Sequence, residues 1–374
     1  MKRIRCLIVL FMLLPMLIPT VHGAEDTVSD LFSEEWDMFV KSIPEEIRPL
    51  AQDALHTSDG AVELQKTFSL SYFWERVVTG LKATWPSAAE LFFSLAGLLI
   101  FTALFHRLCS AVSSDALNTA GELCSTLCLV LCITPVIQSS AEISEEFLTL
   151  ITSCTGGITP VICALLVSTG NITTAAVANV MLMLVYTLFQ SVIQVFLWPI
   201  VRLVYVMGIV GNLGGHLHFD SISRWIRRLF TWILSLMMVF LSVVFGIQGT
   251  MAVSTDSFSI KTAKFALGNF IPLVGNALSD AVGTVAGSLS LIKNTCGAFG
   301  LITVALLLLP VILHLLIHRI VIGAARGMAE LLGCEREGRL LGEMYASLGY
   351  ILAIVALVSA LFIFILSLII SVRF

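Results

Sequence analysis

Residues 346–371 read ASLGYILAIVALVSALFIFILSLIIS, a run of 26 residues without a charged side chain. A helix needs about 20 apolar residues to cross the roughly 30 Å of hydrocarbon in a bilayer. This run therefore predicts a transmembrane helix. Similar runs cover most of the chain after residue 86, so the sequence predicts an all-α, polytopic membrane protein.

The apolar runs predict eight transmembrane helices. One block is ambiguous, because residues 174–211 contain a single charge, Arg202, and fit either one tilted helix or a tight hairpin of two spans. The hairpin keeps the predicted sides of the loops mutually consistent, and we adopt it. The spans are then expected at 87–105, 117–137, 147–168, 174–191, 193–211, 229–248, 297–317 and 346–371.

The composition excludes several classes of protein. The chain of 374 residues is 57% hydrophobic and 12% charged, with a mean hydropathy of +0.97. Soluble domains are roughly 45–50% apolar and roughly 25% charged. A net charge of −4 offers no general attraction to polyanions. A soluble enzyme, a disordered protein and a nucleic-acid binder are therefore excluded.

The N-terminal part of the chain resembles an exported segment. Lys2, Arg3 and Arg5 precede a short apolar run, so residues 1–23 are predicted to be a signal peptide. The alternative is an uncleaved anchor helix. Residues 24–85 carry twelve Asp and Glu against five Lys and Arg. We expect residues 24–86 to form a small, acidic, helical region outside the cytoplasm.

The arginines predict which loops face the cytoplasm. Two loops hold clusters of them, and cytoplasmic loops of membrane proteins are enriched in Lys and Arg. Residues 212–228 and 318–345 are therefore predicted inside, and 24–85, 139–146 and 249–296 outside. Pairs such as Arg326 with Glu330 and Arg339 with Glu343 lie four residues apart and favour an interfacial helix in 318–345. The clusters are Arg224, Arg227 and Arg228, and Arg319, Arg326, Arg336 and Arg339.

No motif in the sequence indicates catalysis or a cofactor. Cys124, Cys128 and Cys132 share one helix face, which could be a thiolate metal site but is more typical of small residues that let helices pack closely. The string His216-Leu217-His218 falls in a glycine-rich turn and is interpreted as a surface loop rather than a metal site. HExxH, GxSxG and Walker-type motifs do not occur in the chain. We therefore expect no metal, no cofactor and no enzymatic activity.

Residues 249–296 separate the first spans (87–248) from the last two (297–374). They are rich in small residues and interrupted by Gly and Pro, which predicts either broken, re-entrant helices or an interfacial pair. A re-entrant element is a candidate pore or partner segment. Within the spans, Arg202 is a separate candidate, because an intramembrane charge is costly. The alternative is that its long side chain simply reaches toward the interface from about ten residues inside the span. The candidate residues of the segment are Lys261, Lys264, Gly268, Asn269, Pro272, Gly275, Asp280 and Lys293.

One sequence in this segment is specific enough to suggest a family. Residues 262–275 read TAKFALGNFIPLVG and are followed by Thr284-Val285, Ser288 and Lys293-Asn294. This pattern resembles the signature of the stage III sporulation protein AE family. The predicted signal peptide, the acidic stretch and the multi-span remainder are also similar to that family, so the resemblance covers essentially the whole chain.

The resemblance implies a role in endospore formation. Members of the family are mother-cell membrane components of the channel complex between mother cell and forespore. Their implied partners are ring-forming proteins, an ATPase and a forespore protein, and the implied location is the mother-cell-derived outer forespore membrane. An independent secondary transporter of a small solute is the alternative that the broken segment and Arg202 leave open.

Overall fold

The computed structural model describes residues 70–112, 115–168, 172–213, 220–254 and 275–371. All of these residues lie in helices except Gly333 and Cys334. The predicted signal peptide, most of the acidic region and residues 255–274 lie outside the described ranges. The helices are α5 (Leu70–Val112), α6 (Asp115–Ser168), α7 (Ile172–Val192), the π-helix η2 (Ile193–Leu197), α8 (Trp198–Leu213), α9 (Asp220–Ser254), α11 (Gly275–Leu332) and α12 (Glu335–Ser371).

Six stretches of the described helices are long and apolar enough to cross a bilayer. Many large apolar side chains on them face outward, among them Phe93 (71% exposed) and Leu131 (73% exposed). An outward apolar surface is what lipid contact requires. The prediction of an all-helical, multi-span protein is thereby supported, with six candidate spans in place of eight. They are Trp74–Cys109, Thr119–Gly157, Leu182–Asn212, Ser221–Val244, Val304–Leu332 and Glu335–Leu366.

The helix α6 joins two stretches that the sequence predicts as separate spans. Residues 117–137 and 147–168 belong to one helix of 54 residues. The intervening residues 139–146, predicted as an acidic loop, contain neither Gly nor Pro, so nothing in their backbone ends the helix. The hydroxyl of Ser144 donates a hydrogen bond to the Ser140 carbonyl one turn earlier (2.7 Å), so this polar side chain is satisfied within the helix.

The ambiguous block 174–211 is one continuous helix, so the predicted hairpin is wrong. The break that the hairpin requires between residues 191 and 193 is absent, and the chain continues into η2, where the Trp198 N–H donates to the Ile193 carbonyl, five residues back. Proline cannot donate a backbone hydrogen bond and its ring crowds the preceding turn. A π turn directly before Pro199 lets the chain continue as a helix.

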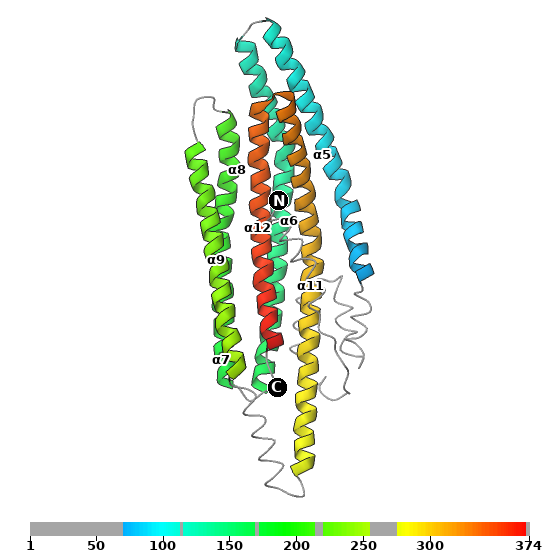
Figure 1. The fold of residues 1–374 in the computed structure, drawn as a ribbon, viewed down its shortest axis with the longest axis vertical. Coiled ribbons are helices and arrows are strands. Elements are labelled where there is room, and N and C mark those ends of the chain that lie inside the picture. Colours follow the sequence, from blue (N-terminus) through cyan, green and yellow to red (C-terminus); the bar gives the residue numbers. More distant parts are fainter. Residues whose placement is uncertain (1–69, 113–114, 169–171, 214–219, 255–274, 372–374) are drawn as a thin grey trace.

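Helix α12 occupies the centre of the bundle. Figure 1 shows it between α8 and α9 on one side and α11 on the other, with α6 behind. The most apolar stretch of α12 is 67% buried inside the bundle, whereas the corresponding stretch of α9 is 22% buried. Its buried side chains include Leu348, Ile351 and Phe362. The charge-free run that predicts a span therefore forms the core.

A tight turn joins α11 to α12. Gly333 has φ +76°, a conformation that favours glycine. The Gly333 N–H bonds the Glu330 carbonyl (3.4 Å) and the Cys334 N–H bonds the Ala329 carbonyl (2.9 Å), which together form a Schellman motif. The predicted interfacial helix within 318–345 is therefore two helix ends that meet at Gly333.

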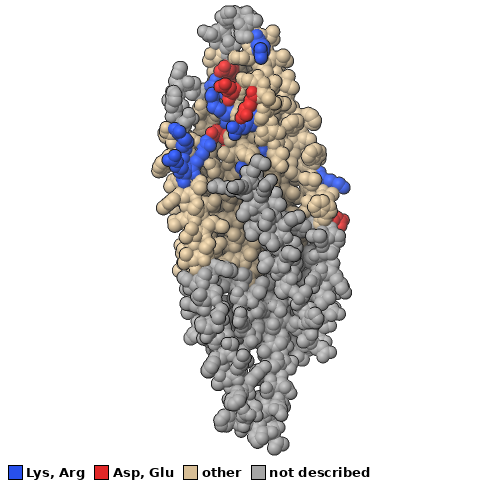
Figure 2. All heavy atoms as spheres, viewed as in Figure 1, with Lys and Arg blue, Asp and Glu red and all other residues tan. Residues whose placement is uncertain are grey.

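Both arginine-rich segments lie at one end of the bundle. The end of α8, the start of α9 and the α11–α12 turn are at the same end in Figure 1. Figure 2 shows Lys, Arg, Asp and Glu gathered near that end, above a mostly uncharged described surface. We call it the charged end and define it by Glu122, Asn212, Arg227, Arg336 and Glu343. Both segments are predicted to lie on the cytoplasmic side, and their described residues lie at one end of the bundle.

Candidate functional site at the charged end

Arg336, in the first turn of α12, connects three helices. Its Nη1 donates to Oε2 of Glu122 on α6 (3.0 Å), and its Nε donates to the backbone carbonyl of Asn212 at the end of α8 (2.6 Å). The last carbonyls of a helix have no partner within that helix. Arg336 supplies one for α8 and is only 17% exposed. The charge therefore fixes the start of α12 against the ends of α6 and α8.

The residue that follows Arg336 on α12 is a carboxylate. Glu337 is buried, and its Oε1 accepts a hydrogen bond from the Ser125 hydroxyl of α6 (2.5 Å). Buried carboxylates are costly unless hydrogen-bonded. Ser125 and Glu122 lie one turn apart on α6. The same face of α6 therefore provides a partner for both Arg336 and Glu337 of α12.

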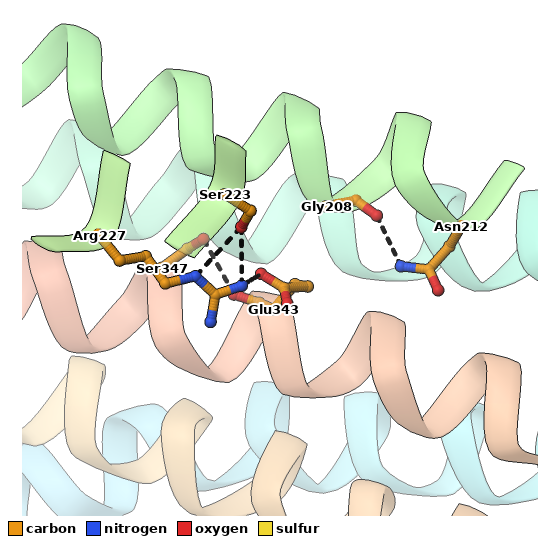
Figure 3. A network of polar contacts seen from close by, with 6 residues as sticks. All are labelled: Gly208, Asn212, Ser223, Arg227, Glu343 and Ser347. Atoms are coloured by element: carbon orange, nitrogen blue, oxygen red, sulfur yellow. Dashed lines mark hydrogen bonds and ion pairs between the residues drawn. The ribbon is translucent and has the colours of Figure 1, made fainter. Parts of the chain in front are cut away.

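The third connection joins α9 to α12. Figure 3 shows Arg227 of α9 pointing at Glu343 of α12, with which it forms an ion pair. Arg227 also donates to the Ser223 hydroxyl from Nη2 (3.0 Å) and Nε (3.2 Å). The Ser347 hydroxyl donates to the Glu343 carbonyl (3.0 Å). Both charged side chains are less than one third exposed, so solvent screens this pair only in part.

Gly208 allows α8 to approach α12 at the same level. A Cβ atom at Gly208 would lie 2.8 Å from the Cβ of Glu343, which is closer than real contacts allow. The Asn212 side chain, one turn later, donates to the Gly208 carbonyl (2.7 Å), as Figure 3 also shows. Small residues at such positions let helices in membranes pack closely.

Helix α11 is joined to α12 below the turn. The Arg319 guanidinium lies over the ring of Tyr345 (4.3 Å), a cation–π contact. The predicted pair Arg326–Glu330 is present at 3.0 Å on the exposed face of α11. Glu343, expected beside Arg339, instead pairs with Arg227.

Cys334, in the turn between α11 and α12, is a buried thiol. Burial raises its pKa above the ordinary value of 9.0, and the negative charge of Glu337 raises it further. The thiol is therefore protonated at neutral pH and is a poor nucleophile. The arrangement packs Cys334 against α5, where its sulfur is 4.0 Å from the Leu99 carbonyl.

Most residues of the candidate segment have no described environment. Lys261, Lys264, Gly268, Asn269 and Pro272 lie outside the described residues. Gly275 is the first residue of α11. The backbone at Asp280 and Lys293 is part of the same uninterrupted helix, so residues 275–296 continue directly into the span expected at 297–317.

Arg202 lies in α8 and has a partner that the sequence did not predict. Its Nη2 is 3.0 Å from Oε1 of Glu145 on α6. Glu145 belongs to the predicted extracytoplasmic loop 139–146, and the two residues are 57 positions apart. Only the packing of α6 against the α7–η2–α8 helix brings them together.

The cysteine triplet and the histidine string give no metal site in the described structure. Cys124 is exposed, and Cys128 and Cys132 are half-buried on α6. His216 and His218 lie outside the described ranges. Within those ranges, no group of three His, Cys, Asp or Glu side chains could hold a metal ion.

Together, these features define a polytopic helical membrane protein whose helices are joined at one end by buried and half-buried charges. The chain belongs to a sporulation family: residues 57–373 match the family described as stage III sporulation protein AE. It is 26% identical to the Stage III sporulation protein AE of Bacillus subtilis (strain 168) over 275 residues, covering 73% of this chain and 69% of that protein. No solved structure matches. The family gives the protein a role in sporulation and confirms the resemblance found in residues 262–294.

Proposed function

We propose that the protein is a membrane subunit of the channel complex that links mother cell and forespore during endospore formation. In this proposal it resides in the mother-cell-derived outer forespore membrane and is needed for late forespore gene expression and forespore integrity. Its partners are the ring-forming proteins, the ATPase and the forespore protein of that complex. The family membership and the six candidate spans support the proposal.

The charged end is the observation on which the proposal depends most. Its internal ion pairs hold α6, α9 and α12 in one arrangement, and the hydrogen bond from Arg336 to the Asn212 carbonyl adds α8. Outside those pairs it presents Arg228 and Arg339 on its surface, and Leu331 is 89% exposed beside the turn. A cytoplasmic surface with outward arginines and an exposed leucine suits a soluble protein partner. We therefore propose that the mother-cell ATPase docks there.

The docking proposal is tested with substitutions that leave the internal network intact. Arg228→Glu combined with Arg339→Glu should reduce recovery of the ATPase with the tagged protein at least fivefold. The control is Arg76→Glu, also an exposed arginine but near the start of α5, at the other end of the bundle. An immunoblot of membranes checks that all variants accumulate equally. Unchanged ATPase recovery in the double variant would reject docking at this end.

We also propose that the subunit has no catalytic activity of its own, since its sequence lacks the nucleophile, metal-ligand and phosphate-loop motifs. Energy would then come from the ATPase partner. The measurement is nucleotide hydrolysis by the purified protein alone, which should not exceed that of a detergent blank.

A second candidate function, independent transport of a small solute, is favoured by the ion pair of Arg202 with Glu145 beside a polar cavity. The two functions are distinguished by reconstitution. Ion-coupled uptake by the purified protein in liposomes would favour the transporter, whereas co-purification with the ATPase and ring proteins favours the channel subunit.

A further inference from the structure

A cavity of about 300 Å³ lies between α6 and the α7–η2–α8 helix. Polar side chains supply much of its lining, although it lies between candidate spans. The Arg202–Glu145 ion pair lies at the cavity, and Arg202 is 72% exposed and Glu145 46% exposed. The polar and aromatic side chains that line it are Glu145, Thr149, Gln190, Gln194, Trp198 and Arg202.

The π-helix η2 explains how one helix supplies four of these residues. Gln190, Gln194, Trp198 and Arg202 recur every four residues. In a regular α-helix each such step drifts by about 40° around the axis, because 3.6 residues make a turn. The π turn at Ile193–Leu197 takes more residues per turn and so reduces the drift. The four side chains consequently line the same cavity.

The ion pair lies well inside the apolar part of α8. Arg202 is ten residues from Asn212, which is about 15 Å along a helix and about half the thickness of the hydrocarbon. Val195 (62% exposed) and Phe196 (53% exposed) belong to the same turn as Gln194, are apolar and do not line the cavity. Charged side chains at this depth face water or protein rather than lipid.

We propose that this cavity is filled with water in the membrane, is open to the aqueous phase and admits small hydrophilic ions. The guanidinium and carboxylate at its mouth discriminate between ions by charge. The amides of Gln190 and Gln194 and the hydroxyl of Thr149 give water the partners that it needs in such a site. This inference holds whether the protein is a channel subunit or an independent transporter.

Water access is tested by single cysteines in the full-length chain in native membrane vesicles. The probe is a membrane-impermeant methanethiosulfonate with a trimethylammonium group, and the unsubstituted chain corrects for native thiols. Gln194→Cys should be modified at least tenfold faster than Val195→Cys or Phe196→Cys. The three positions are adjacent and all exposed in the isolated chain, so only the medium around each differs.

Thr149→Cys, on the α6 wall, gives a second and independent measurement with the same expectation. Equal rates at positions 194, 195 and 196, with position 149 no faster, would overturn the proposal. So would slow modification of positions 194 and 149 in membranes that becomes fast in detergent, because protein or lipid would then cover the cavity.

The role of the ion pair is tested in the Gln194→Cys background by comparing the cationic probe with an anionic sulfonate probe. Glu145→Gln should lower the ratio of cationic to anionic modification rates at least threefold, and Arg202→Gln should raise it at least threefold. Arg202→Lys retains the charge and should leave the ratio within twofold of the parent. If all three variants give the parent ratio, the pair does not select ions.

Discussion

The ion pair between Arg227 and Glu343 should couple α9 to α12 by about 1–2 kcal/mol of unfolding free energy. Exposed pairs contribute roughly 0.2–1 kcal/mol, and removing one partner of a fully buried pair costs roughly 3–5 kcal/mol. The side chains of Arg227 and Glu343 are 30% and 24% exposed, so this pair lies between the two cases. The coupling should therefore exceed that of the exposed pair Arg326–Glu330.

A double-mutant cycle isolates this coupling. The variants are Arg227→Met, Glu343→Gln and the combination of both. The hydrogen bonds from Arg227 to Ser223 are lost in both variants that lack the arginine, so they cancel in the cycle. The free energy of unfolding is measured for each purified protein in mixed micelles by titration with sodium dodecyl sulfate.

The chain provides a matched control in Arg326 and Glu330, a pair at 3.0 Å whose side chains are 48% and 60% exposed. The same substitutions there should give about 0.2–0.5 kcal/mol, as for other helix pairs four residues apart. A coupling between Arg227 and Glu343 no larger than this control would refute the conclusion that the pair is protected from solvent and holds α9 in place.

Two further predictions concern the same end of the bundle. Gly208→Ala should destabilise the protein by about 1–3 kcal/mol, because the new methyl group meets Glu343 and overpacks the interface. The control is Gly211→Ala, in the same helix but with open space around the glycine. Measured by the same dodecyl sulfate titration, this variant should be neutral or more stable by up to about 1 kcal/mol. The raised pKa of Cys334 predicts slow alkylation of this thiol at pH 8 and a contribution to stability that is complete below pH 9 and lost as the pH rises through the raised value. Burial is the larger cause of the raised pKa, and the charge of Glu337 adds to it. Glu337→Gln removes this second contribution and should speed alkylation at a fixed pH; an unchanged rate would show that burial alone sets the pKa.

The sequence predicts the spans whose boundaries depend on local properties. The charge-free run 346–371 lies within α12, and the two arginine-rich segments lie at one end, because apolar length and charge are readable without tertiary information. The errors arise where a local signal was ambiguous. The acidic residues in 139–146 suggested a loop, but this stretch contains neither Gly nor Pro and continues as part of α6. Gly333, which follows two leucines at the end of a helix, is the turn signal that could have divided 318–345 correctly.

The polar partners could not be predicted from the sequence. Arg202 stands out as the one charge in 174–211, but nothing local points to Glu145. The same holds for Arg336, whose contacts on Glu122 and Asn212 lie more than a hundred residues away. Helical periodicity gives the face on which a residue lies and does not give the helix that this face meets.

Those distant partners matter because apolar surface alone cannot determine which helices meet inside a bilayer. Lipid tails are as apolar as leucine, so helix association depends on close packing and polar contacts. Among the described residues, ion pairs join α6 to α8, α9 to α12, and α12 to α6. Helix α8 enters the same set through the carbonyl of Asn212 and the close approach at Gly208. The few charges of these helices therefore specify how α6, α8, α9 and α12 meet, whereas α11 packs against α5 and α12 mainly through apolar surface.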